Sequence, residues 1–223
     1  FITSTLQQDA SHRLGFTSKR TMKIAQELYE GIEVKGFGSV GLITYMRTDS
    51  LRISEESRAA ANEYIKNTFG DDYLPEKPRY FKTKANAQDA HEAIRPTNIA
   101  LTPVKVKDSL ARDLFRLYQL IWKRFAASRM APAIYETTSV KLKAGGNSFT
   151  MAASSLKFDG FMSVYTEADE KDEKSQNLAK IEMGQEMELA ELVSAQHFTQ
   201  PPAHYREASL VKALEEQGIG RPS

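Results

Sequence analysis

The chain has 223 residues, 41% of them hydrophobic, which is enough for one large domain or two ordinary domains with an apolar core. It contains no cysteine, which excludes disulfides and thiolate metal sites. The lack of cysteine fits a cytoplasmic protein. The chain also has no run of about 18 apolar residues and no visible signal peptide, so the sequence indicates no membrane span. Because the chain starts at Phe1 without a methionine and stops at Ser223, we expect both ends to lie within a longer protein.

Charge is unevenly distributed along the chain, although the formal net charge is only +1. Residues 1–131 contain 21 Lys and Arg against 15 Asp and Glu, a net charge of +6. Residues 132–223 contain 9 against 14, a net charge of −5. Because basic surfaces attract phosphate backbones, this division indicates a basic working part followed by an acidic or neutral support. The alternative is a mixed surface that divides unevenly by chance.

Two helices are expected at the start of the chain. The first has Thr3 or Ser4 as its cap, runs to Leu14 and has Gly15 as its stop. The second covers about residues 19–30, after Thr17 or Ser18 as its cap, because its apolar residues recur at helical spacing.

The stretch GLITYMRTDS, residues 41–50, follows a loop with four glycines at residues 31–41. Its apolar, β-branched start favours an extended strand. Side chains alternate between the faces of a strand, so Tyr45 and Arg47 are expected to point the same way, with Asp49 following. A phenol beside a guanidinium can serve as a nucleophile with an anion-binding partner. The alternative for Tyr45 is a packing role, because the chain has nine tyrosines.

The middle of the chain is expected to be mainly helical. A capping serine and two acidic residues predict a helix over residues 54–69, and a strong apolar stripe predicts a long core helix over 110–129. Between them, residues 77–84 interleave basic and aromatic side chains, which can bind a single nucleic-acid strand or form a solvated loop. Residues 89–95 predict a short helical turn, on which positions i and i+4 share a face.

Strand alternation replaces helical spacing after residue 131. It predicts strands over residues 134–142, 148–155 and 187–196, followed by a helix over 207–217. We therefore expect an α+β multidomain fold. Its parts are an α-rich domain with the tyrosine (1–131), a β-rich segment (132–204) and the start of a further helical domain (205–223).

Four stretches, in order along the chain, resemble one family. TYMRTDS around Tyr45 is similar to the active-site motif of type IA DNA topoisomerases, and Met46 within it resembles the bacterial topoisomerase I branch. The other three are FITSTLQQ at residues 1–8, AHEAIRPT at 90–97, and EASLV with GIGRPS at 207–211 and 218–223. Because four separate matches occur in the family's order, the chain is identified as an internal fragment of a bacterial member.

The resemblance implies an enzyme that relaxes negatively supercoiled DNA. It cuts one strand through a 5′-phosphotyrosine intermediate, passes the other strand and reseals the cut. The resemblance implies single-stranded or negatively supercoiled DNA as the partner, and no membrane. It implies a location in the bacterial cytoplasm at the nucleoid. Residues 132–204 would then form part of an arch or hinge.

The same resemblance assigns candidate site residues. Tyr45 is expected to be the nucleophile and Arg47 to hold the scissile phosphate, since the guanidinium is always charged. His91 in the AHEAIRPT stretch is expected near that phosphate, although a lone histidine by spacing alone is more often structural. Arg95 is expected to touch the DNA backbone or to pair with an acid. Arg221 resembles a family position near the active site.

The family also implies Mg²⁺, bound by carboxylates of an acidic metal-binding domain upstream in the same polypeptide. This chain has no Asp-x-Asp pair at a strand end, and Asp71 and Asp72 are adjacent, a poor spacing for chelation. We therefore expect no metal ligands in this chain and no DNA cleavage by the chain alone. The alternatives are a non-enzymatic single-stranded DNA-binding module and a structural interaction module.

Overall fold

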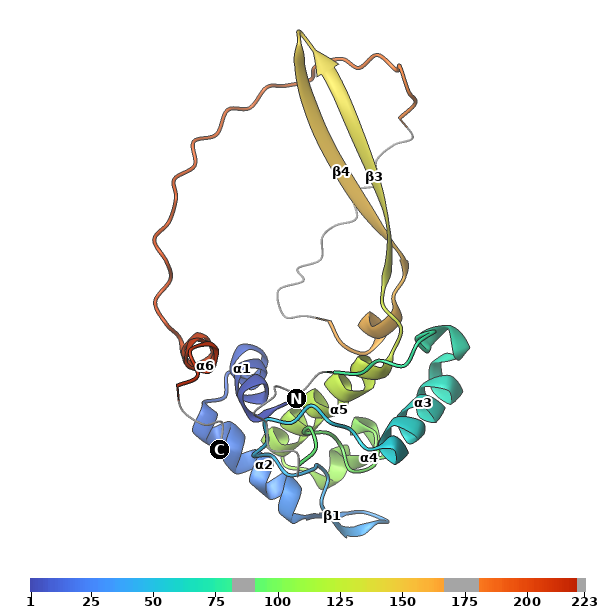
Figure 1. The fold of residues 1–223 in the computed structure, drawn as a ribbon, viewed down its shortest axis with the longest axis vertical. Coiled ribbons are helices and arrows are strands. Elements are labelled where there is room, and N and C mark those ends of the chain that lie inside the picture. Colours follow the sequence, from blue (N-terminus) through green and yellow to red (C-terminus); the bar gives the residue numbers. More distant parts are fainter. Residues whose placement is uncertain (82–90, 167–180, 220–223) are drawn as a thin grey trace. The chain divides into compact units, whose positions relative to one another are not determined.

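The computed structural model describes residues 1–81, 91–166 and 181–219 of the chain (Figure 1). It divides the chain into two compact units. The first unit contains Phe1–Ala133, Asp159–Glu170 and Tyr205–Ser223; the second contains Ile134–Phe158 and Lys171–His204. Helices and strands both occur, which fits the α+β class. The three consecutive domains expected from the sequence stay a prediction.

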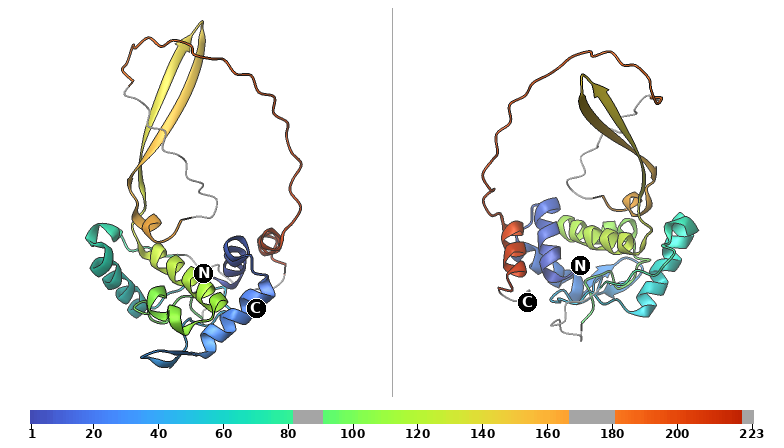
Figure 2. Two further views of the ribbon diagram at one scale, coloured as in Figure 1. Left: turned by 180° about the vertical axis from the view of Figure 1, so that it is seen from behind. Right: turned by 45° about the horizontal axis from the view of Figure 1, so that its top comes forward.

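The first unit is built around its longest helix, α5. This helix contacts α1, α2, α3 and α4, and it lies between α1 and α3 in each view of Figures 1 and 2. The helices of this unit are α1 (Thr3–Leu14), α2 (Ser18–Glu30), α3 (Glu55–Phe69), α4 (Pro103–Val106), α5 (Arg112–Arg129) and α6 (Glu207–Glu216). Short 3₁₀ turns cover Asp71–Tyr73, Lys107–Ser109 and Gly160–Ser163. No helix of the described ranges is long and apolar enough to cross a membrane.

Local sequence signals explain where these helices begin and end. The Thr17 hydroxyl accepts a hydrogen bond from the Arg20 N–H at 3.2 Å, and the Ser54 hydroxyl accepts one from Ser57 at 3.3 Å. Gly15 ends α1 with a φ of 67°, a left-handed conformation that glycine adopts without strain. The helices predicted over residues 19–30, 54–69, 110–129 and 207–217 are confirmed, and so is a first helix that ends at Leu14. The cap predicted for the first helix, Thr3 or Ser4, is wrong, because α1 already begins at Thr3 and its N-cap position is Ile2.

Core packing fixes the segment that follows AHEAIRPT, residues 98–102, onto α5. Tyr118 is fully buried and donates a hydrogen bond to the Leu101 carbonyl at 2.5 Å. Trp122 donates from Nε1 to the Ile99 carbonyl at 2.9 Å. Each ring therefore buries its apolar body while its polar atom is paired, as buried aromatic residues require.

The strand predicted over residues 41–50 is wrong, because this stretch is extended but has only one isolated bridge, between Ile43 and Pro96. Its backbone groups bond to several different partners. The Leu42 N–H donates to the Leu28 carbonyl at 2.7 Å, and the Thr44 N–H donates to the Arg95 carbonyl at 3.0 Å. No continuous strand of the described residues lies beside it to form a ladder.

The glycine-rich loop before this stretch contains a small hairpin that the sequence did not predict, with strands β1 (Ile32–Val34) and β2 (Gly38–Val40). It returns the chain closely onto the end of α2. A Cβ at Gly41 would lie 2.7 Å from the Tyr29 carbonyl oxygen, so only glycine fits this approach.

The helical turn predicted over residues 89–95 is wrong for residues 91–95, and residues 89 and 90 lie outside the described residues. The Ala93 N–H donates to the Arg52 carbonyl and the Ile94 N–H to the Phe1 carbonyl, each at 2.8 Å. These bonds to distant segments replace those a turn would form within itself. Pro96 also disfavours helical geometry at the residue before it.

The second unit contains one antiparallel hairpin, β3 (Ile134–Ala144) with β4 (Asn147–Phe158). The strands predicted over 134–142 and 148–155 are confirmed and are somewhat longer than expected. Gly145 and Gly146 form the connecting turn with φ values of 54° and 83°. The strand predicted over 187–196 is wrong, because this exposed segment has no strand pairing.

Candidate active site

The Tyr45 stretch is held in place by the first turn of α1. The Thr3 hydroxyl donates to the Met46 carbonyl at 2.8 Å and accepts from the Thr48 N–H at 2.9 Å. Met46 is fully buried, whereas Tyr45 is half-buried and Arg47 is exposed. The alternation expected of a strand is therefore present at these three residues, because Met46 anchors the stretch and turns its two neighbours outward.

Tyr45 lies in a cluster of three rings. Its ring centroid is 5.5 Å from that of Tyr29 on α2, in an edge-to-face arrangement with an interplanar angle of 69°. It is 5.2 Å from the ring centroid of His91, at an interplanar angle of 36°. Such contacts stabilise the phenol ring by about 0.5–1.5 kcal/mol each and fix its direction. The structure thus brings together two residues predicted from separate motifs.

Sequence reasoning placed Tyr29 only in the apolar stripe of the second helix. In the structure it is 40% exposed and contacts the Tyr45 ring. A signal was present, because Tyr29 lies in the last turn of this helix, two residues before the glycine-rich segment that starts at Gly31. Such a segment can turn the chain sharply back, and Gly41 does approach the Tyr29 backbone.

Arg47 faces an open groove along α2 rather than the interior. The groove is lined by Arg47 together with Lys19, Met22, Lys23, Gln26 and Glu27. Three of these side chains are cationic and one is acidic, so the groove has a net positive charge. Tyr45 contacts the same helix through Tyr29. An anionic strand that lies along α2 would therefore meet both the phenol and the guanidinium.

Arg95 lies inside the unit, with only 8% of its surface exposed. Its guanidinium donates to Glu92 Oε2 from Nε at 3.0 Å and from Nη2 at 2.5 Å, and to the Pro96 carbonyl at 3.0 Å. Its backbone N–H donates to the Thr44 hydroxyl at 3.0 Å. Arg95 therefore fixes the His91 segment beside the Tyr45 stretch by pairing with an acid, while its contact with DNA stays a prediction. Arg221 lies outside the described residues.

Replacing Glu92 with glutamine is expected to lower the free energy of unfolding by about 2 kcal/mol, because it leaves a buried guanidinium without its counter-charge. Urea denaturation followed by circular dichroism measures this. The matched control is Glu55→Gln, since Glu55 pairs with Arg58 but its side chain is 94% exposed. The control is expected to change stability by less than about 0.5 kcal/mol. Equal effects of both variants would show that the Arg95 pair has no special structural role.

The basic and aromatic stretch is described up to Phe81; residues 82–84 lie outside the described residues. Tyr80 is 73% exposed, and the Arg58 guanidinium lies 5.0 Å from its ring centroid. Arg129 donates to the Arg79 carbonyl at 2.8 Å, and burial together with the nearby Arg58 lowers the pKa of Arg129. These contacts fit a solvated loop that is anchored on α3 and α5. They fit equally well a basic surface with an exposed aromatic ring, that of Tyr80.

Metal binding needs several oxygen or nitrogen ligands around one point. Within residues 1–81, 91–166 and 181–219, no three His, Asp or Glu side chains are grouped in this way. That this chain supplies no Mg²⁺ ligands stays a prediction.

Comparisons with known proteins agree with the motifs. Residues 1–223 match the family described as DNA topoisomerase. DNA topoisomerase 1 from Xylella fastidiosa, strains Temecula1 and 9a5c, is 50% identical over 230 residues, covering 100% of this chain and 28% of each relative. Full-length topoisomerase I from Thermotoga maritima is structurally similar with a TM-score of 0.74 and 38% identity, covering 100% of this chain and 35% of that one. The chain spans about a third or less of these relatives, and it belongs to the DNA topoisomerase family, as a bacterial type IA member.

Proposed function

We propose that this chain supplies the nucleophilic tyrosine of an enzyme that relaxes negatively supercoiled DNA by transient cleavage of one strand. The single observation that carries the proposal is the position of Tyr45. Its phenol is half-buried between Tyr29 and His91, in the stretch that also presents Arg47 to a cationic groove. A packing tyrosine would not need an imidazole and an open basic groove beside it.

In the proposed reaction, Tyr45 Oη attacks the phosphorus of a phosphodiester. The new Oη–P bond joins the tyrosine to the 5′ phosphate, the P–O3′ bond breaks, and the 3′ oxygen leaves and takes up a proton. The phenol must lose its own proton, which a free phenol holds up to a pKa of about 10. Resealing is the reverse attack by the 3′ hydroxyl, so no nucleotide cofactor is consumed.

Arg47 and His91 have separate roles in this proposal. Arg47 binds the scissile phosphate through its fork of donors and stabilises the charge that builds up on the phosphoryl oxygens. His91 orients the phenol by ring contact and can donate an N–H to the same phosphate. Arg95 keeps the His91 segment in register through Glu92.

The remaining parts of the proposal follow from family membership. Mg²⁺ and its carboxylates would be supplied by a metal-binding domain upstream in the same polypeptide. Residues 132–204, which contain the β3–β4 hairpin, would form part of the arch or hinge that lets the strand pass. The enzyme would act in the bacterial cytoplasm on nucleoid DNA.

The test compares the chain of residues 1–223 with the longest natural polypeptide that contains it. Each is incubated with Mg²⁺ and a single-stranded oligonucleotide labelled at its 3′ end, and then denatured. We expect a labelled protein band only for the longer polypeptide, because this chain is expected to lack the metal ligands. An adduct on the chain alone would contradict that part. DNA binding without any adduct in either sample would favour a non-enzymatic single-stranded DNA-binding module.

A further inference from the structure

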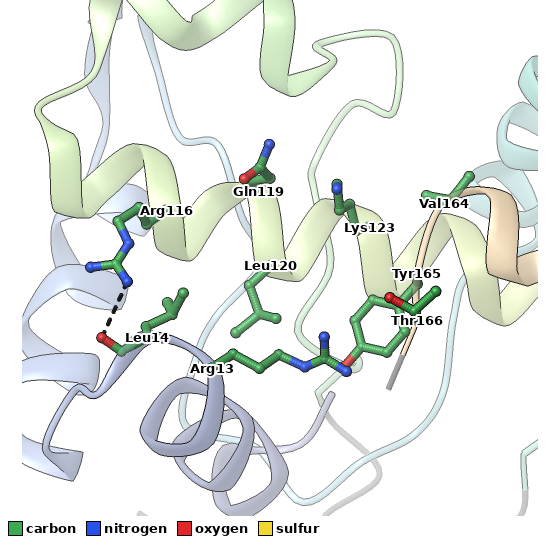
Figure 3. A pocket seen from close by; sticks show the side chains of 9 residues that line it. All are labelled: Arg13, Leu14, Arg116, Gln119, Leu120, Lys123, Val164, Tyr165 and Thr166. Atoms are coloured by element: carbon green, nitrogen blue, oxygen red, sulfur yellow. Dashed lines mark hydrogen bonds between the residues drawn. The ribbon is translucent and has the colours of Figure 1, made fainter. Parts of the chain in front are cut away.

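A second basic cavity lies in the first unit, on residues that the Tyr45 site does not use. It has a volume of about 200 Å³ and lies between α1, α5 and the segment that follows the Gly160–Ser163 turn. Figure 3 shows Arg13 from α1 below α5, with its guanidinium against the Tyr165 ring, and Leu120, Arg116 and Lys123 on α5. We propose that this cavity binds a phosphodiester of single-stranded DNA at a distance from the cleaved bond, a role that rests on the proposed function.

The charges at the cavity favour an anion. Arg13, Arg116 and Lys123 line it, and none of its lining residues within the described ranges is acidic. The nearby acid is Asp9, whose carboxylate already accepts a hydrogen bond from the Tyr165 hydroxyl and lies 3.7 Å from Arg13 Nε. Within the described part of the chain, neither Arg116 nor Lys123 has an ion pair. Two cations therefore remain uncompensated here, and a phosphate would neutralise them.

Unused hydrogen-bond donors also point to a ligand. The Nε of Arg13 is buried without a hydrogen-bond partner, and its charge is paired with Asp9 at 3.7 Å, so this atom is not a donor to the cavity. Arg116 spends one N–H on the Leu14 carbonyl at 3.3 Å, as Figure 3 shows, and a guanidinium has five donors in all. Phosphate oxygens that approach the cavity would find the remaining donors of Arg116 and the ammonium group of Lys123.

Tyr165, which lines the cavity, contacts two guanidinium groups. That of Arg13 lies 4.2 Å and that of Arg124 5.1 Å from the centroid of its ring. Burial and the hydrogen bond to Asp9 raise the pKa of Tyr165 to about 12, so the phenol stays a neutral donor to Asp9 at physiological pH. This bond keeps Asp9 turned to Tyr165, which limits its repulsion of an anion in the cavity.

The lining distinguishes a nucleotide of DNA from a free inorganic ion. Leu14, Leu120 and Val164 give the cavity an apolar part beside its cations. A sugar or base can pack on such a surface while its phosphate meets the cations, whereas inorganic phosphate gains nothing from it. The observations therefore favour a phosphodiester within a strand as the occupant.

The test measures binding of a fluorescent single-stranded oligonucleotide to the chain by anisotropy at several salt concentrations. Lys123→Glu is expected to weaken binding about tenfold, since the ammonium that would pair with a phosphate is replaced by a carboxylate that repels it. The slope of log affinity against log salt is expected to fall by about 0.7 for each phosphate that is no longer neutralised. Lys107→Glu is the matched control, because Lys107 is exposed on another turn of the same unit. Arg116→Gln is a second variant of the cavity, and Lys123→Arg is expected to retain binding.

The outcomes separate this proposal from the function above. Equal affinities of Lys123→Glu and Lys107→Glu, together with weak binding by Arg47→Ala, would overturn the cavity while the Tyr45 site stands. Unchanged binding in all three would contradict both. Inorganic phosphate is titrated separately, with the Arg116→Gln protein as reference. If the affinity of inorganic phosphate equals the affinity of the oligonucleotide per bound phosphate, the cavity is a site for free phosphate and the assignment to DNA is wrong.

Discussion

Tyr45→Phe is expected to abolish the covalent DNA adduct completely, because the substitution removes the attacking oxygen. Phenylalanine keeps the ring, and therefore its contacts with Tyr29 at 5.5 Å and His91 at 5.2 Å. Folding and non-covalent DNA binding should remain within about twofold of the unsubstituted protein, since one half-exposed hydroxyl contributes little to either. The measurement is denaturing electrophoresis of the longest natural polypeptide after incubation with Mg²⁺ and a 3′-labelled strand.

The matched control for this experiment is Tyr29→Phe. It makes the same chemical change on the neighbouring ring and preserves the edge-to-face contact with Tyr45. We expect this variant to form the adduct at a rate close to that of the unsubstituted protein. If Tyr29→Phe lost the adduct while Tyr45→Phe retained it, the nucleophile would be Tyr29 and the assignment to Tyr45 would be wrong.

Arg47→Ala is expected to slow the cleavage step by about 10²–10³-fold, the effect of removing one well-placed donor to a reacting oxyanion, about 3–4 kcal/mol. Because Arg47 is exposed, the variant should fold with unchanged stability. Arg47→Lys is expected to recover only part of the rate, since an ammonium does not offer the planar fork of donors. The measurement is a single-turnover cleavage rate at a DNA concentration that saturates each variant.

Saturating DNA separates the role of Arg47 in the reaction from a general loss of positive charge. Lys23→Ala is the matched control, because Lys23 lines the same groove on α2. It should weaken binding a few-fold and leave the saturated rate nearly unchanged, as expected for a screened, solvent-exposed charge. Equal rate losses for Arg47→Ala and Lys23→Ala would show that Arg47 contributes only to the electrostatic field of the groove.

The elements that the sequence predicted correctly depend on signals that act over a few residues. Thr17 and Ser54 cap helices because their hydroxyls reach an N–H three positions on. Gly145 and Gly146 form the turn of the hairpin because the turn needs positive φ angles at both positions, and glycine adopts them without strain. The wrong predictions are different in kind. Residues 41–50 and 187–196 have strand-like alternation, but pairing needs a partner strand, and a local pattern does not supply one.

The candidate site shows the same division. The motifs identified Tyr45, Arg47 and His91, but gave no reason to place Tyr29 beside them. Sequence spacing left two roles open for Arg95, as a DNA contact or as the partner of an acid. In the structure Arg95 is buried and bonded to Glu92, so it is the partner of an acid. A guanidinium this far from solvent needs a counter-charge beside it.

By itself, the sequence determined the family, the long helices and the identity of the candidate reactive side chains, because these depend on local spacing and on residue chemistry. Only the tertiary structure decided that the Tyr45 and His91 rings touch, that Arg47 opens onto α2 and that Arg13, Arg116 and Lys123 surround one cavity. The physical reason is that such contacts join segments far apart in the chain. Their geometry is set by how the helices pack and by where the connecting backbone finds its hydrogen-bond partners.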